Sequence, residues 1–221
     1  MSDAKRAATI ETLARLETAY GVVRFEPCLD PLEELVACIL SQHTADARSV
    51  PAFHRLRGAY PEWHALAEAS VEEIAAEIRD AGLSNQKAKS IRAALRAICD
   101  RYGTYTLEPL KELEDIEAKA ILESLPGVGP KTASIVLCFA MGRPVVPVDT
   151  HVFRVSWRLG LIPRELGEAR AHDALLRIVA PADCLRFHLL LIEHGRAVCH
   201  ARKPACGLCA VRDLCAHGSA A

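Results

Sequence analysis

Hydrophobic residues recur along most of the chain at the three- and four-residue spacing of amphipathic helices. Two segments show the pattern best, with apolar residues at Leu32, Leu35, Val36, Ile39 and Leu40, and at Ala88, Ile91, Leu95 and Ile98. Because residues three and four apart share one helix face, these segments are predicted to be helices with one buried side. Glycine and proline interrupt the pattern, and the distances between them predict helices of ten to sixteen residues. One of these helices is expected to begin after Gly82 and to end before Gly103. The chain is therefore predicted to be all-α.

Residues 143–148 (RPVVPV) are the one stretch with a β-like composition. Two prolines in so short a run favour an extended connector over a paired strand, so no sheet is expected there. The connector is a candidate domain boundary. The chain shows no internal repeat and no low-complexity tract, which argues against a solenoid.

Composition and charge narrow the class of protein. The 221 residues are 51% hydrophobic and 25% charged, which fits one large globular domain or two small ones. No apolar run approaches the ~18 residues of a membrane-spanning helix, and the first residues lack a secretory signal, so a cytoplasmic protein without membrane association is expected. The net charge of −1 does not indicate a nucleic-acid binder, so any DNA contact must depend on local geometry.

The first candidate motif is residues 125–131 (LPGVGPK), which lies between two helical patterns. Gly127 and Gly129, separated by Val128, allow a sharp turn and a close approach to another molecule, and Pro130 suits the first turn of the next helix. Backbone N–H groups at that helix start suit a phosphate. An ordinary helix-to-helix turn is the alternative. The pattern resembles the helix-hairpin-helix, a module that binds the DNA backbone without sequence specificity, and Lys131 after it could simply pair with a phosphate.

The second motif is a group of four cysteines within seventeen residues near the C-terminus. The chain has nine cysteines, an odd number that disulfides cannot consume. Five are spread among apolar neighbours and are expected to be small buried residues: Cys28, Cys38, Cys99, Cys138 and Cys184. The other four are predicted to share a metal: Cys199, Cys206, Cys209 and Cys215. Zinc usually takes two close pairs and only one is present, so a [4Fe–4S] cluster is favoured and zinc is the alternative.

Basic residues gather around these cysteines and could supply a local positive patch, with Asp213 the opposing acid. They are Arg196, Arg202, Lys203 and Arg212. A merely solvated face is the alternative interpretation.

Residues 148–151 (VDTH) complete a pattern that identifies a family. With LPGVGPKTA and VDTHVFRV, the chain resembles the endonuclease III group of helix-hairpin-helix DNA glycosylases over about residues 32–215, including the cysteine spacing. The resemblance implies that Lys131 is the nucleophile and Asp149 its catalytic partner, although Asp149 also lies where it would cap the following helix. It implies two helical domains, a six-helix bundle with the hairpin (24–143) and an iron–sulfur cluster domain (1–23 plus 144–221), with the active site between them.

Two further loops, residues 40–46 (LSQHTAD) and 82–88 (GLSNQKA), resemble the family's DNA-wedging loops. There a polar side chain and a leucine fill the gap left by an extruded nucleotide. His43 stands where the family usually has glutamine, with Gln42 beside it, and Leu83 matches the leucine; core packing is the alternative for Leu83. His151 and Arg154 match family residues near the substrate sugar and phosphate, and a histidine satisfied between helices is the alternative.

The resemblance implies a monomeric base-excision-repair glycosylase and abasic-site lyase that acts on double-stranded DNA with a damaged base or abasic site. It would remove oxidised pyrimidines and nick by β-elimination through a Schiff base on Lys131, with the cluster serving a structural role. In a bacterium it would be associated with the nucleoid. Two alternatives remain open: a monofunctional mismatch or damaged-base glycosylase, and a non-catalytic hairpin protein that only binds DNA.

Overall fold

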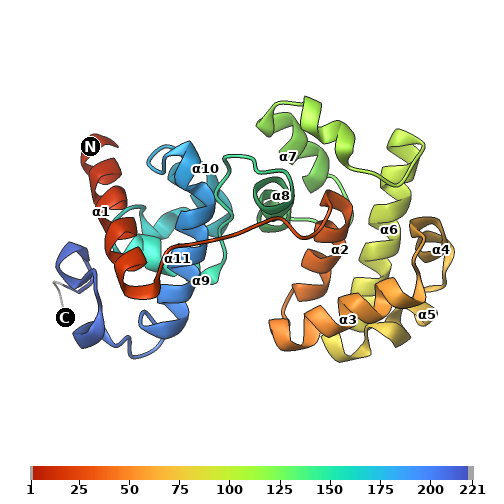
Figure 1. Ribbon diagram of the computed structural model, residues 1–221, viewed down its shortest axis with the longest axis horizontal. Helices are drawn as coiled ribbons and strands as arrows, with labels where there is room; N and C mark the ends of the chain where they lie inside the picture. The colour runs from red at the N-terminus through yellow and green to blue at the C-terminus, as the bar shows by residue number, and fades with distance from the viewer. Residues whose placement is uncertain (1, 219–221) are drawn as a thin grey trace. The chain divides into compact units, whose positions relative to one another are not determined.

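The computed structural model describes residues 2–218, and all regular secondary structure in that range is helical (Figure 1). The predicted all-α class is confirmed. Residues 143–148 form an extended connector without strand pairing, as their two prolines predict. Within the described range, no helix is both long and apolar enough to span a membrane.

Two compact units make up the described chain. Unit 1 combines the chain up to Glu26 with the chain from Gly142 onward, and unit 2 is the continuous segment Pro27–Met141. Unit 1 is therefore built from segments that are far apart in sequence, whereas unit 2 is local.

Unit 2 is organised around the long helix α6. Its helices are α2 (Pro31–Ser41), α3 (Asp46–Ala59), α4 (Trp63–Glu68), α5 (Val71–Glu77), α6 (Ser84–Tyr102), α7 (Asp115–Glu123) and α8 (Pro130–Ile135), with 3-10 turns η1 (Arg79–Ala81) and η2 (Glu108–Glu112). Helices α2, α4 and α5 pack against α6, and α2 also packs against α3 and α8. All nine apolar positions predicted to form buried faces on α2 and α6 are buried. Asp30 begins α2 through a capping box with Glu33, and Gly103 ends α6 in a left-handed conformation.

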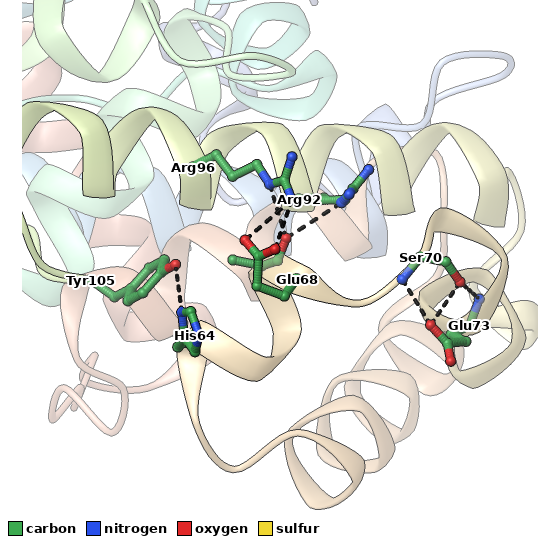
Figure 2. Close-up of polar contacts among 8 residues, drawn as sticks. His64, Glu68, Ser70, Glu73, Arg92, Arg96 and Tyr105 are labelled. Carbon is green, nitrogen blue, oxygen red and sulfur yellow. Dashed lines mark hydrogen bonds and ion pairs between the residues drawn. The ribbon is translucent and has the colours of Figure 1, made fainter.

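Polar contacts hold the short helix α4 beside α6 and cap the start of α5 (Figure 2). The guanidinium groups of Arg92 and Arg96 donate to the carbonyl of Ala67 at 3.4 and 3.1 Å, and Arg96 also pairs with Glu68 at 3.2 Å. Ser70 caps α5 in a second capping box, with Glu73. Exposed ion pairs add little stability, so these contacts mainly orient helices whose buried faces hold them in place.

Unit 1 packs the N-terminal helix against the last long helix of the chain (Figure 1). Its helices are α1 (Ser2–Tyr20), α9 (Thr150–Arg158), α10 (Gly167–Leu176) and α11 (Cys184–Ala197), with turns η4 (Arg164–Leu166), η5 (Pro181–Asp183), η6 (Cys206–Leu208) and η7 (Arg212–Leu214). Phe187 of α11 is fully buried in a core that includes Leu13 and Leu16 of α1 and Val152 and Val155 of α9. Helix α11 contacts both α1 and α9, so the N-terminal segment of unit 1 packs directly on its C-terminal segment.

Three details differ from the sequence predictions. Helices α1 and α6 have 19 residues each, and α4 and α5 only six and seven, so the range of ten to sixteen was wrong at both extremes. The segment after the hairpin, predicted as one regular helix, changes after α8 into a π-helical turn, η3 (Val136–Ala140). Cys28 is exposed and Cys99 half-buried, because Cys28 lies in the irregular segment before α2 and Cys99 near the end of α6.

Candidate functional site

The hairpin between α7 and α8 has the predicted shape of helix, tight turn and helix. Helix α7 ends at Glu123 and α8 begins at Pro130, and the turn is closed by the N–H of Val128 donating to the carbonyl of Leu125 at 3.1 Å. Pro130 occupies the first turn of α8, where its missing N–H removes no helical hydrogen bond. The side chain of Val128 is buried, so any contact of this residue with DNA must come from its backbone.

The two hairpin glycines are required for different reasons. Gly127 has φ +79°, and a Cβ added there would lie 2.6 Å from both Cβ and Oγ of Ser90 on α6. Gly129 is extended, with φ −107°, and a Cβ there would meet no atom within 4 Å. The fold itself therefore requires glycine at 127, whereas glycine at 129 keeps an open backbone clear of any side chain.

Lys131 is the second residue of α8 and is partly exposed. Helix α2 packs against α8 and presents Glu34, Cys38 and Gln42, which share one face because they are four residues apart. The amide of Gln42 donates to the carbonyl of Gly127 at 3.0 Å and to the hydroxyl of Thr132 at 3.4 Å. This face of α2 therefore holds both the hairpin and the start of α8.

Glu34 and Cys38 lie near Lys131, and the sequence did not identify either of them as part of the site. Burial raises the pKa of the Glu34 carboxyl group, and the positive charge of Lys131 opposes that effect. Burial also raises the pKa of the Cys38 thiol, which contacts the Thr132 side chain and stays neutral. The four-residue spacing of these side chains was the only signal in the sequence. It acquires meaning only once α2 is known to pack against α8.

The structure brings the two predicted wedge loops together. His43, just after α2, has φ +55°, and Leu83, just before α6, has φ +48°, so both are non-glycine residues in the left-handed region. They line a single hollow of about 130 Å³ together with Gln42, Gln86, Lys87 and Ser90. His43 is exposed and Leu83 is 57% exposed, so the core-packing alternative for Leu83 is wrong.

Asp149 caps α9 in unit 1, as its position before the helix predicts. Its Oδ1 accepts the N–H of Val152 at 2.7 Å. One turn later, Arg154 lies 3.0 Å from Nδ1 of His151 and donates to the carbonyls of Gly195 and Cys199, both at 2.9 Å. His151 and Arg154 thus join α9 to α11 and to the cysteine segment, and their contact with DNA stays a prediction.

The four clustered cysteines surround one enclosed cavity in unit 1. Its other lining residues are mostly apolar: Val155, Arg158, Leu159, His194, Val198, Pro204, Val211 and His217. Within residues 2–218, no three or more Cys, His, Asp or Glu side chains are placed to hold a single metal ion. The four cysteines predicted to share a metal come together around this cavity.

Polar groups surround the sulfur atoms, and Cys215 Sγ itself donates to the carbonyl of Arg158 at 3.2 Å. Arg158 Nη1 lies 3.3 Å from Cys199 Sγ, and the N–H of Gly218 donates to Cys215 Sγ at 3.4 Å. His194 lies between Tyr20, 2.8 Å from Nδ1, and Cys209 Sγ, 3.5 Å from Nε2.

The protonation of Tyr20 and His194 follows from their burial. Burial lowers the pKa of His194 to about 4, so the ring is neutral at neutral pH. Burial, with the charge of Cys209 next in size, raises the pKa of Tyr20 to about 12, so its hydroxyl keeps its proton. The Tyr20 hydroxyl and Nδ1 of His194 share one hydrogen bond, and Nε2 of the same neutral ring faces the Cys209 sulfur.

The basic residues near the cysteines are exposed, as both a positive patch and a merely solvated face require, so the patch stays a prediction. Asp213, the acid among them, is paired with Arg15 of α1 at 2.6 Å, and this contact lowers the pKa of Asp213. The pair neutralises the one opposing charge and attaches η7 to α1.

Comparison with known proteins shows the class to which this arrangement belongs. The profile of the HhH-GPD superfamily of base excision DNA repair proteins matches residues 36–181, and that of the iron-sulfur binding domain of endonuclease III matches residues 199–215. Endonuclease III of Escherichia coli K12 is 37% identical over 84% of this chain and 83% of its own length. Endonuclease III of Synechocystis is 37% identical over 97% of this chain and 94% of its own.

Solved structures agree with these sequence matches. A trapped endonuclease III–DNA covalent intermediate superposes with a TM-score of 0.83 at 30% identity, over 97% of both chains. A thermostable thymine-DNA glycosylase gives 0.80 at 25% identity, over 99% of both chains. The helical fold, the hairpin and the profile match together define a DNA glycosylase of base excision repair.

More narrowly, the chain belongs to the endonuclease III family. DNA is therefore its binding partner, and its C-terminal segment is the family's iron–sulfur binding domain. The resemblance noted from the hairpin, aspartate and cysteine motifs is confirmed, and so is an iron–sulfur cluster as the class of cofactor.

Proposed function

We propose that this chain is a monomeric, bifunctional glycosylase and abasic-site lyase that removes oxidised pyrimidines from duplex DNA. The observation that carries the proposal is the placement of Lys131, a partly exposed amine on the residue after Pro130, where the hairpin passes into α8. A hairpin that contacts the phosphates on either side of a lesion would bring this amine to the sugar. A relative with 30% identity was solved as a trapped covalent intermediate with DNA, which is consistent with an amine nucleophile.

Lys131 would attack C1′ of the damaged nucleotide as a neutral amine. The bond from C1′ to the base breaks, the base leaves with its electron pair and takes up a proton, and the amine gives up one proton. The nitrogen lone pair then breaks the bond from C1′ to O4′, O4′ takes up a proton, and the opened sugar is held as a protonated Schiff base. Loss of a proton from C2′ then breaks the bond from C3′ to its phosphate oxygen. The strand is nicked by β-elimination, and water releases the lysine.

Asp149 would assist the departure of the base by accepting a proton or by stabilising positive charge on the sugar. The helix cap uses one of its two carboxylate oxygens, for the N–H of Val152. The cap fixes the carboxylate and leaves the second oxygen for this role, so the structural and catalytic interpretations of Asp149 are compatible.

The wedge is assigned to His43 and Leu83. Gln42, the other polar candidate, already donates its amide to Gly127 and Thr132, so it supports the hairpin from within unit 2. His43 and Leu83 are exposed and line the same hollow. They would fill the space left when the damaged nucleotide leaves the stack.

The cofactor is proposed to be a [4Fe–4S] cluster held by Cys199, Cys206, Cys209 and Cys215. When bound, it cross-links the segment after α11, which has little regular structure of its own. The donors from Arg158 and Gly218 would balance the negative charge of the sulfur atoms. Zinc is the alternative metal, and the iron and zinc content of the purified protein would distinguish the two.

Borohydride trapping on a thymine glycol duplex tests the lysine mechanism. Wild type and the control Lys119→Gln, on α7, should form a covalent complex and nick the strand. Lys131→Gln should lose both by at least about 10³-fold while its DNA affinity changes by less than about threefold. Asp149→Asn should keep the fold, because asparagine is itself a good helix cap, but slow base release by about 10²-fold or more.

Each alternative function predicts a different result. A monofunctional glycosylase would release the base in the wild type without a trapped complex or a nick. A hairpin protein that only binds DNA would release no base from any lesion duplex. A complex still trapped by Lys131→Gln would place the nucleophile elsewhere.

A further inference from the structure

Lys87 of α6 is a buried cation that the proposed mechanism does not use. It is 2% exposed, and its ammonium group donates three hydrogen bonds, to the carbonyl of Leu40 at 2.6 Å, the hydroxyl of Thr44 at 2.7 Å and the carbonyl of Ala81 at 2.8 Å. All three acceptors are neutral, and the part of the chain that the structure describes supplies no carboxylate partner. The donors of the ammonium are thus fully satisfied, although its charge is not balanced.

A buried ammonium without a counter-charge is an unfavourable choice for packing alone. Burial lowers the pKa of Lys87, with the charge of Arg48 acting in the same direction. A methionine or leucine would fill the same volume without desolvating a charge. The ammonium must therefore contribute something that an apolar side chain could not, namely a fixed geometry for its three acceptors.

The three acceptors belong to the two wedge loops. Leu40 and Thr44 lie on either side of the segment that carries His43, and Ala81 lies two residues before Leu83. The hydroxyl of Thr44 also donates to the carbonyl of Ala81, so the loops are bonded to each other at the point where Lys87 holds both. His43 and Leu83 adopt left-handed conformations that persist only where their surroundings impose them. The contacts of Lys87 are well placed to impose them.

We propose that Lys87 is a positioning residue that locks the two wedge loops together, so that His43 and Leu83 enter the duplex as one rigid element. The inference rests on the proposed function, because it takes these loops to be the ones that replace an extruded nucleotide. Lys87 lines the base of the same hollow but is only 2% exposed, and its three ammonium donors are all used within the protein, so its role is to position the loops and not to bind DNA.

The expected effect of removing the ammonium depends on how the substrate is stacked. Loops that are free to separate occupy the wedging arrangement for only a fraction of the time, and an extrusion-limited rate falls by that fraction. A lesion that is already unstacked needs no wedge and loses little. A residue important only for stability would slow both substrates alike, through the amount of folded protein.

The test compares Lys87→Met with Lys89→Met, which removes the same charge from an exposed position two residues further along α6. Leu83→Ala serves as the benchmark for a lost wedge. Single-turnover base release is measured on a stacked lesion and on the same lesion opposite a gap. The fluorescence of 2-aminopurine beside the lesion reports extrusion, and amide hydrogen exchange reports the order of residues 42–44 and 82–84.

Lys87→Met should retain helical circular dichroism, slow release from the stacked lesion about 10- to 100-fold, change the gapped substrate less than about threefold, and speed exchange in both loops. Lys89→Met should match the wild type within about twofold on both substrates. The inference would be overturned if Lys87→Met extruded the nucleotide and exchanged its loop amide hydrogens as the wild type does. It would also be overturned if the rate of base release fell equally on both substrates.

Thr44→Val keeps the test decisive if Lys87→Met fails to fold. It removes one of the three acceptors with almost no change of shape, at a half-buried position. It should slow the stacked lesion about 3- to 10-fold and leave the gapped one unchanged, and equal rates on the stacked lesion would overturn the inference. Suppose that Leu83→Ala slows release from the stacked lesion but not from the gapped one, and that Lys87→Met and Thr44→Val match the wild type. The inference about Lys87 then fails while the proposed function stands.

Discussion

Exchange of each hairpin glycine for alanine should separate a glycine required by the fold from one required by the ligand. Gly127→Ala places a methyl group 2.6 Å from Ser90 in a backbone conformation with φ +79°. The left-handed conformation costs alanine about 1–2 kcal/mol. Relief of the contact with Ser90 adds about 1–3 kcal/mol, because α6 must shift. The free energy of unfolding should fall by about 2–5 kcal/mol, which lowers Tm by about 4–20 °C for a chain of this size.

Gly129→Ala should leave stability almost unchanged. Its extended backbone accepts any residue, and the added methyl group meets no protein atom within 4 Å. Alanine restricts the unfolded chain, which stabilises by about 0.4–1 kcal/mol, and it is a poorer helix cap than glycine by about the same amount. The methyl group would instead stand where a phosphate approaches the backbone. Loss of one charge-assisted hydrogen bond of about 1.5–3 kcal/mol corresponds to about 10- to 100-fold weaker binding.

Two measurements decide the comparison. Thermal unfolding followed by circular dichroism gives Tm, and fluorescence anisotropy at fixed salt gives Kd for a lesion duplex and for the same duplex without the lesion. The affinity loss in Gly129→Ala should be similar for both duplexes, because phosphate contacts carry no base information. A Gly127→Ala protein as stable as the wild type would refute the steric argument. Wild-type affinity in Gly129→Ala, or a loss confined to the lesion duplex, would refute the phosphate argument.

Two further outcomes follow from the cysteine cavity and from Glu34. Cys206→Ser should lose more than half of the broad absorption near 400 nm and of the bound iron, because one of four ligands is gone. The control Cys28→Ser, at an exposed site, should keep both. Equal iron contents in the two variants would contradict the ligand assignment. Because burial raises the pKa of Glu34 above its ordinary value, the folded chain retains a proton there that the unfolded chain has already lost, so the free energy of unfolding of the wild type falls as pH rises above 4.5. Glu34→Gln should therefore gain stability relative to the wild type as pH is raised from 4.5 in denaturant titrations, and a difference that does not change with pH would exclude this effect.

Local features of the sequence predicted most of the architecture. The spacing of apolar residues identified the buried faces of α2 and α6, and Gly103 ends α6 where a helix stop was expected. The hairpin and the cap by Asp149 were also predicted, because each depends on a few consecutive residues. The two loops at His43 and Leu83 were recognised from their resemblance to a family, and the structure shows that they line one hollow.

Features that depend on distant residues could not be predicted in this way. Lys87 stands in the wedge-loop motif of residues 82–88, but the sequence assigned it no role, because its acceptors Leu40 and Thr44 come from a different part of the chain. Glu34 gained its importance only from the packing of α2 on α8. The π-helical turn after α8 left no trace in the hydrophobic pattern, since apolar side chains occupy every position of Val136–Ala140.

The way in which unit 1 is assembled from two separate segments imposes an order on biosynthesis. Helix α1 leaves the ribosome first, but the partners of Leu13 and Leu16 on α9 and α11 are translated only after the whole of Pro27–Met141. At about 5–20 residues per second, α1 waits on the order of ten to thirty seconds for α11. Unit 2, whose contacts are all within one continuous segment, is complete before that time. The nascent chain can therefore form its helix-hairpin-helix before unit 1 is complete, and the cysteine segment is among the last parts to be synthesised.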